Sequence, residues 1–181
     1  MSDELLDLIG NWIEAIGTAV AAIGKTNQLA GQTVAGQELG AAGNAVRSLG
    51  NSLQAIANIG DEETKVGNWL QASGTSANSV ADYRRLQDPA NEMDSRQLEI
   101  VGNSLQSVGA MLAAIGRLDE NPKLVYGNVI QSIGSALQGI GVVTMMKNEE
   151  ERGMILDTIG IWLQSIGTAY QAIGASRQYL S

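Results

Sequence analysis

The chain of 181 residues contains no histidine, no cysteine and no phenylalanine, and only two prolines. Without cysteine it has neither disulfides nor a thiolate nucleophile. Without histidine it lacks the imidazole base of many enzymes and a main ligand of the familiar zinc sites. These absences remove the usual agents of several reaction classes. We therefore expect no enzymatic activity, no cofactor and no metal site.

The chain is also poor in charge, and the charge that it has is mostly acidic. Eleven basic against nineteen acidic residues give a net charge of −8, which argues against nucleic acid as a partner. Charged residues make up 17%, compared with about 25% in ordinary soluble domains. A weakly charged polar surface suits self-association, so we expect a homo-oligomer and no specific small molecule. The N-terminal residues MSDELLDL lack the features of a secretory signal, which favours the cytoplasm.

Glycine, by contrast, is abundant and recurs every seven residues within segments that are otherwise typical of helices. A glycine inside a helix costs about 1 kcal/mol relative to alanine, and close approach of a partner helix is the obvious compensation. The predicted close-contact positions are Gly10, Gly17, Gly24, Gly43, Gly50, Gly67, Gly74, Gly102, Gly109, Gly116, Gly127, Gly134, Gly141, Gly160, Gly167 and Gly174.

The glycines mark six copies of one segment, such as GNWIEAIGTAVAAIG from residue 10 and GIWLQSIGTAYQAIG from residue 160. Alternate copies begin at residues 10, 67 and 127, which gives a larger unit of 57 to 60 residues present three times. We interpret each unit as a helical hairpin. The chain is then a single helical repeat domain, 1–181, made of hairpins at about 1–60, 61–120 and 121–181.

Capping signals place the helix ends. Ser2, Asp61 and Asn121 stand where a side chain would cap a helix, and proline follows Asn121. The predicted helices cover residues 3–25, 37–60, 61–87, 92–118, 122–147 and 149–179, and the glycine-rich stretch 25–36 is the longest predicted connection. Gly-Asn and Ile-Gly pairs also resemble the turns that separate β-strands. However, the two faces of a strand alternate every two residues, so a period of seven does not indicate a strand.

The heptad gives each helix a wide apolar face. If glycine is position a, then c, d and g are mostly apolar, whereas b and e are mostly polar. We expect the apolar face, spanning about 160°, to pack against other helices with a left-handed supercoil. The predicted fold class is an all-α bundle of six long antiparallel helices. Four carboxylates at position e are then predicted to lie on the surface, namely Asp7, Glu14, Glu99 and Asp157.

The remaining motifs indicate no catalytic, metal-binding or nucleotide-binding site. The acidic runs at 61–63 and 149–151 are explained by helix-start electrostatics, and the glycines are not clustered in a phosphate-binding turn. Trp12, Trp69 and Trp162 occupy the same heptad position in three copies, which favours aromatic packing over a ligand-stacking set.

A membrane role is the main alternative. Residues 124–146 (LVYGNVIQSIGSALQGIGVVTMM) carry no charge and are long enough to span a bilayer, although Asn128, Gln131 and Gln138 interrupt them. Glycine heptads also suit contacts between transmembrane helices. Other helices carry charges near their middles, such as Glu14 and Arg47, which argues against insertion.

The segments GNWIEAIGTAVAAIG and GIWLQSIGTAYQAIG resemble uncharacterised repetitive proteins of Bacillus-type spore-forming bacteria, which share a G-x-W-[IL]-[QE]-[AS]-[IV]-G-T signature. The resemblance implies a bacterial intracellular origin with a spore or stress context, and it transfers no functional residue. Our expectation is a non-enzymatic, self-associating structural or scaffolding protein. The alternatives are an amphipathic protein that binds or inserts into lipid, and a bundle that holds a small apolar ligand.

Overall fold

The structure is a computed structural model that describes residues 2–58 and 61–180, and it confirms the all-α class. The described residues form six long helices and one short 3-10 turn. They are α1 (Asp3–Leu29), α2 (Thr33–Ala57), α3 (Glu62–Gln87), η1 (Pro89–Asn91), α4 (Glu92–Gly116), α5 (Pro122–Met146) and α6 (Glu150–Tyr179).

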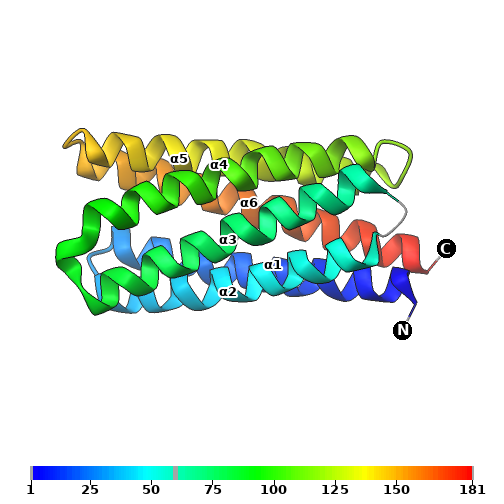
Figure 1. Cartoon of the computed structure of the whole chain (residues 1–181), viewed down its shortest axis with the longest axis horizontal. Coiled ribbons are helices and arrows are strands. Elements are labelled where there is room, and N and C mark those ends of the chain that lie inside the picture. Colours follow the sequence, from blue (N-terminus) through cyan, green and yellow to red (C-terminus); the bar gives the residue numbers. More distant parts are fainter. Residues whose placement is uncertain (1, 59–60, 181) are drawn as a thin grey trace.

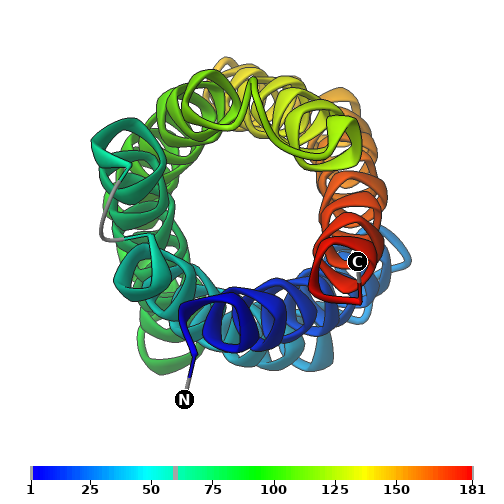
Figure 2. The same ribbon diagram turned by 90° about the vertical axis from the view of Figure 1, so that its right-hand side faces the viewer.

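The six helices stand side by side in a closed ring (Figures 1 and 2). Each helix runs antiparallel to the next in the chain, and α6 packs against α1 to complete the circle. Among the described residues, the backbones of helices on opposite sides of the ring do not approach each other. We call the end that holds both chain termini the terminal end, and the end that holds the α1–α2, α3–α4 and α5–α6 connections the opposite end.

The helix starts follow the capping signals. The Ser2 hydroxyl accepts a hydrogen bond from Leu5 N at 3.3 Å, and an Asp61 carboxylate oxygen accepts one from Thr64 N at 3.1 Å. The Asn121 side chain caps α5, which has proline in its first turn. Each side chain satisfies one of the backbone donors that a helix start leaves unpaired.

The predicted connection at 25–36 is wrong. α1 continues to Leu29 and α2 already begins at Thr33, so only a tight turn separates them. Gly31 makes this turn with a φ of +83°, and Gln32 N donates to Asn27 O at 2.8 Å, which is the pairing of a glycine-terminated helix. The glycine-rich stretch remains helical because Gly24 and Gly36 face each other across the α1–α2 interface.

Three of the six interfaces consist of facing glycines, namely α1–α2, α3–α4 and α5–α6. A Cβ atom added to Gly17 would lie 2.7 Å from Gly43 O, and one added to Gly134 would lie 2.6 Å from Gly160 O. Such distances leave no room for a methyl group, so the backbones touch directly. The facing pairs are Gly10–Gly50, Gly17–Gly43, Gly24–Gly36, Gly67–Gly109, Gly74–Gly102, Gly127–Gly167, Gly134–Gly160 and Gly141–Gly153; Gly116 meets Thr64 and Gly174 meets Lys123.

The other three interfaces are joined by side-chain hydrogen bonds. Ser79 Oγ donates to Ala41 O at 2.7 Å between α3 and α2, and Ser107 Oγ donates to Ser132 O at 3.0 Å between α4 and α5. Between α1 and α6, the indole N–H of Trp12 donates to Ser176 Oγ at 3.0 Å. The ring therefore alternates glycine interfaces with hydroxyl-bonded interfaces.

The expected direction of the apolar faces is wrong. Positions c and g point out of the ring: Trp12 is 46% exposed, Ile16 58% and Ile133 56%. Thirty large hydrophobic side chains are exposed among the described residues, whereas the buried hydrophobic side chains are mostly alanine. The heptad identifies which residues share a face, but the side of the ring that this face occupies depends on how the helices close around one another.

Candidate functional site

The interior of the ring is polar. Heptad positions b and e point inward, and they bury asparagine, glutamine, serine and threonine together with charged side chains. Of the four carboxylates predicted to lie on the surface, Glu14 is 1% exposed, Glu99 2% and Asp157 4%. Asp7 is half-buried and turned towards Arg117. That prediction is wrong because polar helix faces meet one another inside this ring.

A closed circuit of hydrogen bonds and ion pairs runs around the interior and uses a residue from every helix. We call it the interior network. Its members, in order of contact, are Lys25, Glu99, Arg85, Asp82, Asn44, Arg47, Gln164, Gln138 and Asp157, which contacts Lys25 again. In this network each charged or amide side chain has a hydrogen-bond or ion-pair partner, which offsets the cost of removing it from water.

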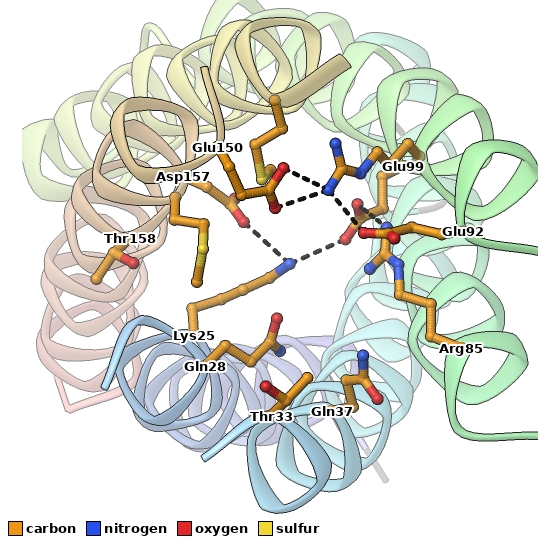
Figure 3. A pocket seen from close by; sticks show the side chains of 13 residues that line it. Lys25, Gln28, Thr33, Gln37, Arg85, Glu92, Glu99, Glu150, Asp157 and Thr158 are labelled. Carbon is orange, nitrogen blue, oxygen red and sulfur yellow. Dashed lines mark hydrogen bonds and ion pairs between the residues drawn. The ribbon is translucent and has the colours of Figure 1, made fainter. Parts of the chain in front are cut away.

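Lys25 joins two helices on opposite sides of the ring, α1 and α4. Its ammonium lies 2.9 Å from Glu99 Oε1 and 3.0 Å from Asp157 Oδ2. The lysine comes from α1, and the two carboxylates come from α4 and α6 (Figure 3). Arg85 also pairs with Glu99 and lies 3.4 Å from Asp82 Oδ1. These five charged side chains form a layer, which we call the charged layer, and it lies towards the opposite end of the ring.

A cavity of about 140 Å³ opens beside this layer at the opposite end (Figure 3). Its lining includes three basic side chains, Lys25, Arg85 and Arg96, and four acidic ones, Glu92, Glu99, Glu150 and Asp157. Arg96 spans the cavity rim, where it lies 2.6 Å from Glu92 Oε1 and 2.7 Å from Glu150 Oε1. The cavity is therefore polar, with a small excess of negative charge.

A second cavity, of about 120 Å³, opens at the terminal end, and the charged residues of its lining are Asp3, Glu4, Asp7 and Glu120. Arg117, which follows α4, pairs with the Asp7 of this lining, and its guanidinium lies 2.7 Å from Asp7 Oδ1. Burial alone would lower the pKa of Arg117, but the charges of Asp7 and Glu120 outweigh it and raise that pKa. Burial raises the pKa of Glu120, while Arg117 acts to lower it.

Some interior amides have no hydrogen-bond partner. Both side-chain polar atoms of Gln106 and Gln131 are buried and have no hydrogen-bond partner among the described residues. Each such atom costs about 1–3 kcal/mol when it stays dry. The interior is thus chemically suited to water or to another small polar guest. No three histidine, cysteine or acidic side chains in the described residues come together as a metal site.

The exterior carries a band without charge. In the middle stretch of each helix, no charged side chain is exposed, because each one that occurs there is buried. These stretches are residues 8–29 of α1, 39–57 of α2, 66–83 of α3, 95–116 of α4, 124–146 of α5 and 153–176 of α6. At 1.5 Å per residue, these segments of 18 to 24 residues are about 27–36 Å long. A bilayer hydrocarbon core is about 30 Å thick. Three helices, Asp3–Leu29, Pro89–Gly116 and Pro122–Met146, are also long and apolar enough by composition to cross a membrane.

The three tryptophans lie on this exterior. Trp12, Trp69 and Trp162 are 46%, 44% and 43% exposed. Trp162 reaches from α6 to α1, where its indole N–H donates to Thr26 Oγ1 at 3.0 Å. Trp12 and Trp162 thus join α1 to α6 from outside, and neither enters the interior.

The interior network was not found from the sequence, although a signal for it exists. In the middle stretches of the helices, charges occur only at heptad positions b and e, as Lys25, Arg47 and Glu99 illustrate. On a surface facing water, charges would be scattered over more positions. Their restriction to one stripe, with both signs present, indicates that the stripe is shared between helices.

The fold and interior define a closed six-helix ring with a polar inside and an apolar outside. The chain belongs to the family of unknown function DUF6944, whose pattern matches residues 5–172. Comparisons with curated proteins and with solved structures give no match.

Proposed function

We propose that this protein is a non-enzymatic membrane protein whose ring of six helices spans the bilayer. The observation that carries the proposal is the charge-free exterior band, which surrounds all six helices and matches the thickness of a hydrocarbon core. The buried charges fit this setting, since ionisable residues within membranes face a protein interior and pair with one another. This proposal replaces the cytoplasmic location that the N-terminal residues favour.

Self-association is the second candidate, because the same exterior would be covered if copies of the ring packed together. Monomeric soluble proteins rarely expose large apolar patches. However, the exposed hydrophobic residues lie on every helix, as Ile16, Leu49, Val80, Val108, Ile140 and Ile166 illustrate. A closed oligomer covers only part of each subunit. Lipid covers the whole circumference, which is why we favour the bilayer. The polar interior offers little to an apolar ligand.

The tryptophans provide the test, because they stand on the exterior at different heights. Trp69 is six residues from the exposed Glu63, Trp12 eight from Glu4, and Trp162 ten from Arg152. At 1.5 Å per residue these separations are about 9, 12 and 15 Å. We therefore expect Trp162 to lie deepest in the bilayer and Trp69 nearest its edge.

The experiment uses three single-tryptophan variants, each with the other two tryptophans replaced by tyrosine, in vesicles whose lipids carry bromine at defined depths. Quenching should be strongest with deep bromines for Trp162 and with shallower bromines for Trp69. Protein in detergent without brominated lipid is the control. If all three tryptophans escape quenching while light scattering in lipid-free buffer shows an oligomer, the exterior is covered by copies of the chain and the bilayer proposal is wrong.

A further inference from the structure

Three features of the interior suit it to small polar or charged solutes. The first is the set of unpaired amides. Gln106 and Gln131 are each 1% exposed, and none of their side-chain polar atoms has a partner among the described residues. They come from the neighbouring helices α4 and α5. A hydrated interior satisfies them, whereas a dry one leaves each at a cost.

The second observation is that each end of the ring holds a cavity with more acidic than basic side chains. At the opposite end four carboxylates face three basic groups, and at the terminal end the lining holds four carboxylates. Rings of acidic side chains at the mouths of a pore attract cations and repel anions. The charge of the two mouths thus selects the class of solute that would enter.

The third observation is the position of Lys25. Its ammonium lies between the carboxylates of Glu99 and Asp157. The cavity beside it is lined by Gln28, Thr33 and Gln37, which gives the lysine side chain a polar space into which it can withdraw. Glu99 also pairs with Arg85.

We propose that the polar interior is a path for small monovalent cations and that Lys25 closes it as a tethered cation. This inference rests on the proposed function, because a path through the ring has a use only if the ring spans a bilayer. In the closed state the ammonium occupies the place between Glu99 and Asp157. Withdrawal of Lys25 leaves the two carboxylates to an incoming K⁺ or Na⁺.

The test measures ion entry into vesicles of phosphatidylcholine and phosphatidylglycerol that contain a trapped K⁺-sensitive or Cl⁻-sensitive dye. Wild-type protein should admit both ions slowly. Lys25→Ala removes the tethered cation and should raise K⁺ entry by about tenfold or more without raising Cl⁻ entry, since the remaining carboxylates favour cations. The matched control is Lys147→Ala, because Lys147 is exposed on the connection after α5 and lies outside the interior. It should behave as wild type.

Lys25→Ala also leaves the buried carboxylates with one positive partner fewer, so the double variant Lys25→Ala/Asp157→Asn restores the charge balance. It should raise K⁺ entry as well, with weaker preference over Cl⁻. Tryptophan quenching on the same vesicles checks insertion. Inserted variants without faster K⁺ entry, or with equal Cl⁻ entry, overturn the path but leave the bilayer proposal intact. Loss of folding in both variants also overturns it, because Lys25 would then be a structural ion pair. Failure of the wild type to insert overturns the proposed function itself.

Discussion

The Lys25 ammonium on α1 and the Glu99 carboxylate on α4 meet at 2.9 Å, although the backbones of their helices lie on opposite sides of the ring and do not approach each other. Their side chains are 10% and 3% exposed. The pair therefore bridges the interior of the ring, whereas the glycine and hydroxyl interfaces join neighbouring helices.

Glu99→Gln should destabilise the protein by about 3–5 kcal/mol, because it leaves two buried cations, Lys25 and Arg85, without their shared carboxylate. The measurement is denaturant unfolding in detergent, followed by circular dichroism. Glu38→Gln is the control, since Glu38 is exposed near the start of α2, and it should change stability by less than about 0.5 kcal/mol. Equal effects of the two substitutions would show that the cross-ring pair contributes nothing.

The sequence predicts the helices of this protein well and their orientation poorly. Caps such as Ser2 and Asp61 act within a few residues of themselves, so local pattern locates them. The inward or outward direction of a face is set by the whole ring and its surroundings. If water surrounded the helices, Ile16 and Ile133 would be expected to face inward, whereas both are more than half exposed.

The interior network illustrates the same limit. Lys25, Glu99 and Asp157 lie far apart in the sequence, and only closure of the ring between α6 and α1 brings them together. The heptad places each of them on a polar face of its helix. It does not identify the partner of each charge, because that depends on the tilt and order of six helices at once.

Gly17→Ala and Gly139→Ala should have effects of opposite sign. A Cβ atom at Gly17 would lie 2.7 Å from Arg47 N and Gly43 O, so α1 and α2 would have to separate. At Gly139 the nearest atom, Asn103 Cβ, is 3.7 Å away, and alanine there should stabilise the helix by about 0.5–1 kcal/mol. Unfolding in detergent gives both values. Stabilisation by Gly17→Ala would disprove the role of backbone contact.

Ser176→Ala should weaken the α1–α6 interface, because Ser176 accepts the indole hydrogen bond of Trp12 on the exterior. The expected loss is about 0.5–1.5 kcal/mol, with little compensation from water if lipid surrounds the indole. Ser104→Ala is matched to it: Ser104 is also on the exterior but donates only to Ile100 O of its own helix. Its effect on thermal unfolding should be negligible. If the two variants unfold alike, the Trp12 bond does not help to close the ring.

Ile133→Lys separates a lipid-facing exterior from one that faces water. Ile133 is 56% exposed and lies near the middle of the charge-free stretch of α5. A lysine at the centre of a membrane helix costs about 2.5–3.5 kcal/mol, so less of the variant should float with vesicles in a density gradient. Val34→Lys is the control, because Val34 is 63% exposed but lies outside the charge-free band, near the start of α2. It should float like the wild type. In an aqueous setting both lysines would be neutral or would improve solubility, so equal flotation of the two variants would contradict an exterior embedded in lipid.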